Sequence, residues 1–233
     1  MNAAQLRAEV EKRLPSAFTT YTREYHGSIP TGVSAIDSLV QGVPLHALTE
    51  ICGSNIASSG KTSALVSLLA QASKDHCCAL VDASDSFDVE TGNAAGVNFP
   101  RLLWIRCGKT KAKLRPLEQA FKVADILLQN GSFKLIAVDI SGIAEHIVRR
   151  IPLSTWFRFS RVVEKQSAAL VFIEQEPHAT SCAELVLRLR TEPVIQSEDS
   201  FAGFDLKVEV LRSGSKKPVR ADRSGTFLHT QWA

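Results

Sequence analysis

Strand-like and helix-like segments alternate along most of the chain, and this alternation limits the fold more than any other feature of the sequence. Apolar runs of strand length occur at 45–52, 76–83, 101–107, 133–141 and 167–175. Helices are expected before and between them, at 32–40, 61–73, 88–96, 115–129 and 143–166, the last interrupted near Pro152. Because parallel strands are joined by crossovers that usually contain a helix, the order predicts an α/β fold. It would hold a mostly parallel twisted sheet with helices on both faces.

The two ends of the chain differ from this pattern. After residue 184, apolar and polar residues alternate in ELVLRLR, FDLKVEVLR and GTFLHTQW, which predicts an antiparallel extension on one sheet edge. Near the N-terminus, the helical spacing of Leu6, Val10 and Leu14 predicts a helix over 4–14, followed by a loose linker. We therefore expect an arm over 1–28 and a core domain over 29–233.

Composition excludes some classes of protein. The chain has 233 residues, 45% of them hydrophobic, and a net charge of +3, which neither requires nor excludes nucleic acid as a partner. Its apolar runs are too short for a membrane span, and its charged N-terminus does not resemble a signal peptide. The cysteines lack metal-site spacing, so buried reduced thiols in a cytoplasmic protein are expected; they are Cys52, Cys77, Cys78, Cys107 and Cys182.

The stretch CGSNIASSGKTS, residues 52–63, lies between an expected strand and an expected helix. Its end, Gly60-Lys61-Thr62, matches the end of the phosphate-binding pattern G-x-x-x-x-G-K-[ST]. That pattern requires glycine at position 55, where this chain has Asn55, and the nearest upstream glycine is Gly53. Either Gly53 begins a loop with two extra residues, or Asn55 takes the left-handed backbone of the missing glycine. Weak nucleotide binding is expected in both cases.

Three side chains would carry the chemistry of such a site. The Lys61 ammonium would reach the β- and γ-phosphates of ATP, and the Thr62 hydroxyl would hold Mg²⁺. Asp139 ends the apolar run LIAVD, and the carboxyl ends of parallel strands line one edge of a sheet. Asp139 is therefore expected near Thr62, orienting Mg²⁺ through water; the alternative is an aspartate that caps the following turn. The other nucleotide-binding positions expected here are Gly53, Asn55, Ser58, Ser59, Gly60 and Ser63.

Several segments resemble the ATPase core of bacterial RecA over residues 29 to 212. In chain order they include IPTGVSAIDSLV, HALTEICG, SSGKTSALVSLLAQA, CALVDASDSFD, FKLIAVDISGI and LVFIEQ. Within that superfamily, ALVDASDSFD, RLLWIRC, RRIPLSTWFRF and EQEPHA are similar to the ImuA group of RecA-like mutagenesis accessory proteins. The resemblance implies ATP and Mg²⁺ as ligands, and it matches Gln175 to the glutamine through which RecA senses nucleotide.

The chain departs from RecA at two places that concern activity. In RecA a glutamate two residues after the strand-end aspartate orients the attacking water, whereas here that position is Ser84. Asp85 is the neighbouring carboxylate and the candidate catalytic base, one position further along and one methylene shorter. The segments that follow Gln175 and Ile143 are short, so the DNA-holding loops of RecA are expected to be truncated. At most a weak ATPase is expected, and recombinase activity is not.

The ImuA resemblance implies an accessory or scaffold protein of the DNA-damage (SOS) response that promotes error-prone translesion synthesis. Its implied partners are an ImuB-like polymerase relative and an error-prone replicative polymerase subunit, with RecA or self-association as further options. Nucleoid association and DNA binding outside RecA-type loops remain open. The alternative function is a compact DNA-stimulated ATPase of the recombinase superfamily.

Three further features have competing interpretations. The segment 149–165 mixes arginines with aromatic residues, which favours an amphipathic helix with Trp156 and Phe159 in the core and the arginines in solvent. It also suits a protein or nucleic-acid interface. Lys216-Lys217 occupy the place of a RecA lysine pair that senses a neighbour's nucleotide, or form a solvated turn. His178 is expected to be structural.

Overall fold

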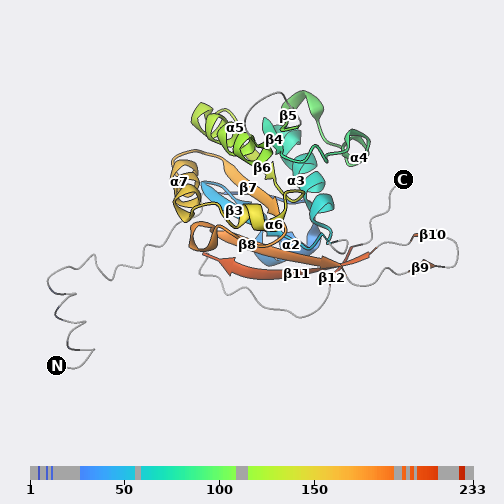
Figure 1. The fold of residues 1–233 in the computed structure, drawn as a ribbon. Helices are drawn as coiled ribbons and strands as arrows, with labels where there is room; N and C mark the ends of the chain where they lie inside the picture. Colours follow the sequence, from blue (N-terminus) through green and yellow to red (C-terminus); the bar gives the residue numbers. More distant parts are fainter. Residues whose placement is uncertain are drawn as a thin grey trace.

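The computed structural model describes residues 27–55, 59–108, 115–191 and 204–214, with Gln5, Glu9, Lys12 and the short pieces 196–197, 200–201 and 226–228. One sheet of eight strands runs through this part of the chain, in the order β12-β11-β8-β3-β7-β6-β4-β5 (Figure 1). Six neighbouring strands are parallel: β8 (Leu185–Thr191), β3 (Ala47–Cys52), β7 (Ala169–Glu174), β6 (Leu135–Asp139), β4 (Cys78–Asp82) and β5 (Leu102–Arg106).

At the β8 edge the sheet continues with antiparallel strands. β11 (Phe204–Ser213) pairs with β8, and β12 (Thr226–Leu228) pairs with β11. A separate hairpin joins β9 (Gln196–Ser197) to β10 (Ser200–Phe201). The predicted α/β architecture with an antiparallel edge is therefore confirmed.

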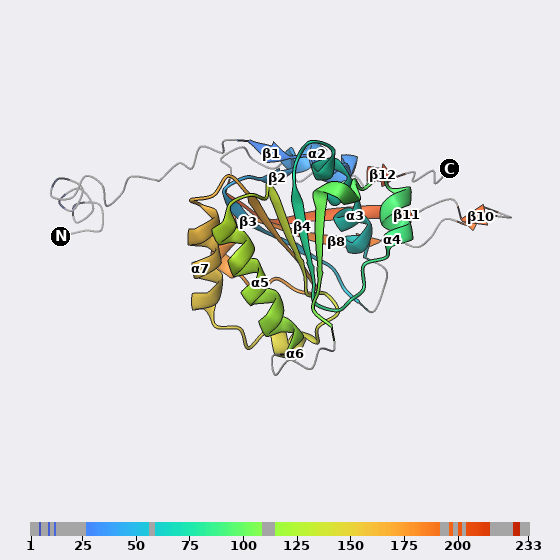
Figure 2. The same ribbon diagram turned by 90° about the horizontal axis from the view of Figure 1, so that it is seen from above.

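Helices cover both faces of the sheet, as the sequence predicts (Figure 2). One face carries α2 (Ser34–Val40), α3 (Lys61–Asp75) and α4 (Val89–Ala94). The other carries α5 (Pro116–Asn130), α6 (Glu145–Val148) and α7 (Leu153–Val163). Because β3, β4, β6 and β7 are covered on both sides, all their residues are buried, which explains their near-continuous apolar sequences.

Two short elements at the entry to the core were not predicted. β1 (Ser28–Ile29) pairs with β2 (Val43–Pro44), and α2 lies between them. The Asp37 carboxylate closes this segment by accepting hydrogen bonds from Thr31 N and Oγ1, both at 2.8 Å, and from Gly32 N at 3.0 Å. Thr31-Gly32 and Asp37 therefore form one hydrogen-bonded turn at the start of α2.

The long helix expected over 143–166 is broken in two, as Pro152 predicts. Pro152 has extended backbone and precedes the first residue of α7, where its missing N–H costs no helical hydrogen bond. On the inner side of α7, Trp156 and Phe159 pack against Phe121 of α5 and Phe172 of β7; the Trp156 and Phe172 ring centroids lie 4.9 Å apart. These aromatic side chains attach α7 to the sheet.

Some predictions lie outside the described residues or differ in detail. The expected helix 4–14, its linker, Ser58 and Lys216-Lys217 lie wholly or largely outside. Two 3-10 turns, Phe99–Arg101 and Thr180–Cys182, were not predicted. Cys77 is exposed, contrary to expectation, whereas the other cysteines are buried. No helix in the described part of the chain is both long and apolar enough to cross a membrane.

Candidate functional site

The loop between β3 and α3 approaches its own far end closely at Gly53. A Cβ added to Gly53 would lie 2.3 Å from Ser59 Oγ and 3.2 Å from Leu189 O, so no side chain fits there. Asn55 is not among the residues with positive φ, so it does not take the left-handed backbone of a glycine. Gly60 does, with φ of 76° at the start of α3. Of the two alternatives, the geometry favours Gly53 as the first glycine of a longer loop.

Lys61 turns its side chain back into this loop. The residue is 6% exposed, and Nζ donates to Gly53 O at 2.7 Å and to Asn55 Oδ1. Burial lowers the pKa of Lys61, while the charge of Asp139 opposes the shift. The ammonium group is therefore desolvated and held by oxygens of the loop itself, at the position where a phosphate would be recognised.

Asp139 lies at the carboxyl end of β6, level with the ends of β4 and β5. In the sheet register Asp139 stands beside Asp82 on one side and Ile173 on the other. Its Oδ1 accepts a hydrogen bond from Ser141 N at 2.9 Å, so it also caps the following turn. Burial raises the pKa of Asp139, and the hydrogen bonds from Ser141 and the charge of Lys61 counteract that shift. Lys61 and Asp139 are thus brought within electrostatic reach of each other.

The oxygen donors expected for Mg²⁺ fit that ion in kind. Thr62, the second residue of α3, is exposed, and Asp139 supplies a carboxylate at the neighbouring strand ends. A hydroxyl and a carboxylate are ligands that Mg²⁺ accepts alongside phosphate oxygens and water. Ser63 is exposed in the same first turn, and Ser59 is buried beside Gly53. The residues present are compatible with a Mg²⁺–nucleotide ligand.

Ser141 joins three parts of the site that are far apart in sequence. Its carbonyl oxygen accepts hydrogen bonds from Asn55 Nδ2 at 2.7 Å and from Gln175 Nε2 at 3.0 Å. Gln175 Nε2 also donates to Ile143 O at 2.9 Å. The loop after β3 and the first residue after β7 therefore hold the same turn after β6. Nothing in the sequence around Ser141 signals this role, because a backbone carbonyl can belong to any residue.

Asp85 does not join this group of residues. It has a left-handed backbone, with φ of 55°, and its carboxylate forms an ion pair with Arg106 of β5, with Oδ2 2.6 Å from Nη2. The hydrogen bond from Arg106 lowers the pKa of Asp85. Since β4 lies between β5 and β6, this pair is drawn toward the β5 side, away from Asp139. Asp85 would have to leave Arg106 to act as a base.

Ser84 occupies the position where RecA places its glutamate. Its Oγ is buried and has no hydrogen-bond partner among the described residues. Gly142, in the turn after β6, packs against it, since a Cβ on Gly142 would lie 2.3 Å from Ser84 Oγ. The space beside the strand ends is therefore filled by a short hydroxyl side chain and the backbone of a neighbouring turn, with no carboxylate from this position.

A buried carboxyl pair lies next to the site and was missed by the sequence analysis. Glu50 of β3 and Glu174 of β7 are 0% and 1% exposed, and each has one carboxyl oxygen without a hydrogen-bond partner among the described residues. Burial, followed by the charge of Glu50, raises the pKa of Glu174 well above its usual range. Glu174 Oε2 lies 2.9 Å from His178 Nδ1. The available signal was a glutamate within each of two otherwise apolar runs, LTEIC and VFIEQ.

Glu50 also fixes the connection between β7 and β8. Its Oε1 accepts hydrogen bonds from the backbone N–H groups of His178 and Ala179, each at 2.6 Å. Ala179 and Cys182 in this connection are buried in the core. The segment 175–184 is thus attached to the sheet at His178 and Ala179, and the contacts of His178 with both glutamates agree with the structural role expected of it.

Comparison with known proteins places these features in a family. The family model for the RecA N-terminal domain matches residues 19–148, more than half of the chain. Protein RecA of Cutibacterium acnes is 35% identical over 115 residues, which cover 48% of this chain and 30% of that protein. Protein RecA of Nautilia profundicola is 25% identical over 228 residues, covering 83% and 63%, and that of Mannheimia haemolytica is 24% identical over 227 residues, covering 83% and 59%.

These matches extend over less than two thirds of the length of the relatives. The matched residues include the loop after β3, Lys61, Asp139 and the β4 turn that carries Ser84 and Asp85. The chain belongs to the RecA family.

Proposed function

We propose that this protein is a nucleotide-responsive accessory protein of the bacterial DNA-damage response, resembling the ImuA group, which promotes error-prone translesion synthesis within a cytoplasmic polymerase assembly. ATP binding would be weak and hydrolysis slow or absent. One observation carries the proposal: Lys61 and Asp139 lie within electrostatic reach of each other beside the strand ends, while the position matched to the catalytic glutamate of RecA holds Ser84. Such a site is better suited to binding ATP as a regulatory ligand than to hydrolysing it.

Nucleotide would be held by residues at the start of α3. The backbone N–H groups at Ser59, Gly60 and Lys61, together with the helix N-terminus, offer partial positive charge to a phosphate. When bound, Mg²⁺ would supply charge neutralisation between phosphate oxygens, held by Thr62 and by Asp139 through water. Gln175 would report the state of the site to the turn after β6, because it already holds Ser141 and Ile143.

Slow hydrolysis is proposed because neither candidate for the catalytic position, Ser84 or Asp85, offers a free carboxylate. A general base must stand within hydrogen-bond reach of its water. The Ser84 hydroxyl is buried against Gly142, and the Asp85 carboxylate is bound by Arg106. A recombinase role is not supported, because the segment 175–184 is attached to the core by Glu50 where RecA resemblance would require a DNA-holding loop.

The proposed partners follow from the ImuA resemblance: an ImuB-like polymerase relative and an error-prone replicative polymerase subunit. The test is co-purification of the tagged full chain with each component, with and without ATP, using Lys61→Ala as the control. The proposal predicts recovery of at least one component. The recovered amount should change with ATP for the unmodified protein and should not change for Lys61→Ala. Recovery of neither component in either condition would contradict it.

A compact DNA-stimulated ATPase is the second candidate, favoured by the intact sequence Gly60-Lys61-Thr62 and by the nearby Asp139. This function would need Asp85 to leave Arg106 and orient water. ATP turnover measured with and without single-stranded DNA separates the two functions. Robust turnover that disappears in Lys61→Ala would favour the ATPase.

A further inference from the structure

The outer face of α7 exposes large apolar side chains to solvent, whereas its inner face packs against the core. Trp156 and Phe159 are 1% and 0% exposed in the core, whereas Leu153 and Phe157 are 44% and 43% exposed. Leu153 and Phe157 are four residues apart, so they lie next to each other on one side of the helix. A protein surface that exposes two large apolar residues side by side is a candidate contact surface.

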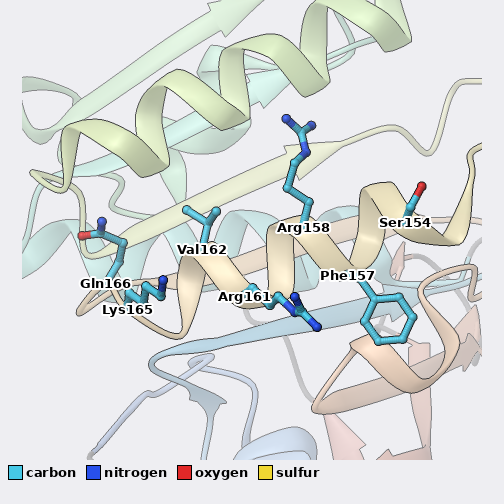
Figure 3. A pocket seen from close by; sticks show the side chains of 7 residues that line it. All are labelled: Ser154, Phe157, Arg158, Arg161, Val162, Lys165 and Gln166. Carbon is cyan, nitrogen blue, oxygen red and sulfur yellow. The ribbon is translucent and has the colours of Figure 1, made fainter.

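The surface is hollowed beside Phe157. A hollow of about 520 Å³ runs along α7, and its lining includes Phe157, Val162 and three cationic side chains, Arg158, Arg161 and Lys165 (Figure 3). No carboxylate is among the lining residues. Figure 3 shows Arg158 directed to one side of the helix, and Phe157 and Arg161 directed to the other. The hollow is therefore lined by both apolar and basic side chains.

Two of the three cations are available to a partner. Arg158 forms an ion pair with Asp125 of α5 and lies over the Phe159 ring, so it is already engaged. Arg161 and Lys165 are exposed, and no described residue forms an ion pair with either of them. They stand four residues apart, in line with Leu153 and Phe157 along the same side of α7. The unpaired positive charge is complementary to carboxylates placed next to an apolar side chain.

The geometry favours a peptide over single-stranded nucleic acid. Binding of single strands uses several aromatic faces on which successive bases stack, with cations that track the backbone. Here Phe157 is the one exposed aromatic side chain of α7, since Trp156 and Phe159 are buried. Among the cations that line the hollow, the two without an ion pair to a described residue, Arg161 and Lys165, lie toward the C-terminal end of α7. The predicted amphipathic helix with Trp156 and Phe159 in the core is thus confirmed.

We propose that the α7 outer surface, formed by Leu153, Phe157, Arg161 and Lys165, binds an acidic segment of a partner protein with an aromatic or aliphatic anchor. The anchor would enter the hollow beside Phe157, and the carboxylates that follow it would pair with Arg161 and Lys165. The inference rests on the proposed function in one respect: an accessory protein needs a surface that binds a partner. Binding of an acidic segment to this surface requires neither bound nucleotide nor a polymerase component as the partner.

The test is a selection from a phage-displayed library of random 12-residue peptides on the immobilised full chain, followed by anisotropy titration of the enriched peptides. Binding is then compared in Phe157→Glu, Arg161→Glu and Lys165→Glu. Val89→Glu on α4 is the control for an apolar residue of matched exposure, at 44%. Lys207→Glu on β11 is the control for an exposed cation. The oligonucleotide dT₃₀ is titrated in parallel.

The proposal predicts enriched peptides that combine an aromatic or aliphatic residue with Asp or Glu, bound at least tenfold more weakly by each α7 variant and equally by both controls. It is overturned if nothing is enriched, if the enriched peptides lack acidic residues, or if the α7 variants bind them unchanged. Binding of dT₃₀ that is lost in the α7 variants, with no α7-dependent peptide, would assign the surface to nucleic acid. A positive result here stands even if co-purification with polymerase components fails.

Discussion

The side-chain amide of Asn55 accepts a hydrogen bond from the Lys61 ammonium, the group expected to recognise phosphate. The same amide donates to Ser141 O in the turn after β6. Asn55 therefore links the loop to the neighbouring strand ends, and it would compete with a bound phosphate for Lys61. This arrangement gives a physical reason why nucleotide binding would be weak but structurally coupled.

Replacing Asn55 with alanine should tighten nucleotide binding. A phosphate would then displace one fewer internal hydrogen bond from Lys61, and such a bond to a charged group contributes about 1.5–3 kcal/mol before compensation by water. We expect the affinity for a fluorescent ATP analogue to rise by roughly threefold to tenfold in a fluorescence titration. Asn93→Ala, which removes an exposed amide on α4, is the control. Unchanged or weaker binding in Asn55→Ala would show that Asn55 does not compete.

Replacing Asp85 with asparagine should leave ATP turnover at the level of the unmodified protein. The reason is that Arg106 already binds the Asp85 carboxylate on the β5 side of the sheet. Steady-state phosphate release, with and without single-stranded DNA, measures the effect. A large loss of turnover in Asp85→Asn would identify this carboxylate as the base and would favour the ATPase function.

The placement of the candidate phosphate-binding residues was predictable from sequence because local geometry fixes it. Gly60, Lys61 and Thr62 follow a strand and begin a helix, and Asp139 ends a strand, so parallel topology alone brings them to one edge. The competing contact of Asn55 with Ser141 was not predictable, since 86 residues separate the two. Its formation depends on strand order, which sequence periodicity does not specify.

The Glu50–Glu174 pair was missed for a related reason. Each glutamate is the single charged residue in its own apolar run, so neither sequence on its own indicates a pair. Only the pairing of β3 with β7 shows that the two carboxyl groups share one buried location. The orientation of the Asp85 side chain toward Arg106 could not be predicted either. It depends on a left-handed backbone at Asp85, and no glycine in the sequence signals that conformation.

The buried carboxyl pair predicts a pH dependence of stability. The unfolded chain loses the Glu174 proton near the ordinary value of 4.5, whereas the folded chain, in which the pKa is raised, keeps it to higher pH. Above 4.5 the folded state therefore binds more protons than the unfolded state, and its stability falls as the pH rises toward the folded pKa.

Glu174→Gln should remove this contribution, so its stability relative to the unmodified protein should increase between pH 5 and pH 8. Urea denaturation at both pH values measures the difference, and Glu145→Gln, at an exposed position, is the control. A constant difference across this range would show that Glu174 does not carry the proton.

Two phenylalanines of α7 should differ sharply when each is replaced with alanine. Phe159 is 0% exposed and packs on Phe121 and Phe172, so Phe159→Ala should lower the free energy of unfolding by about 3–5 kcal/mol. Phe157 is 43% exposed, and Phe157→Ala should change it by about 0.5 kcal/mol or less. Urea denaturation of both variants tests the assignment, and equal losses would contradict the orientation of α7.

The most direct test of the central claim, that the phosphate site is kept while hydrolysis is lost, is equilibrium dialysis of the full chain against labelled ATP and Mg²⁺. The nucleotide on each side is then identified by thin-layer chromatography. We predict an excess of unhydrolysed ATP on the protein side, reduced about tenfold or more in Lys61→Ala, which removes the charged donor of the site. No excess of nucleotide, or conversion of the retained ATP to ADP by the unmodified protein but not by Lys61→Ala, would contradict the account.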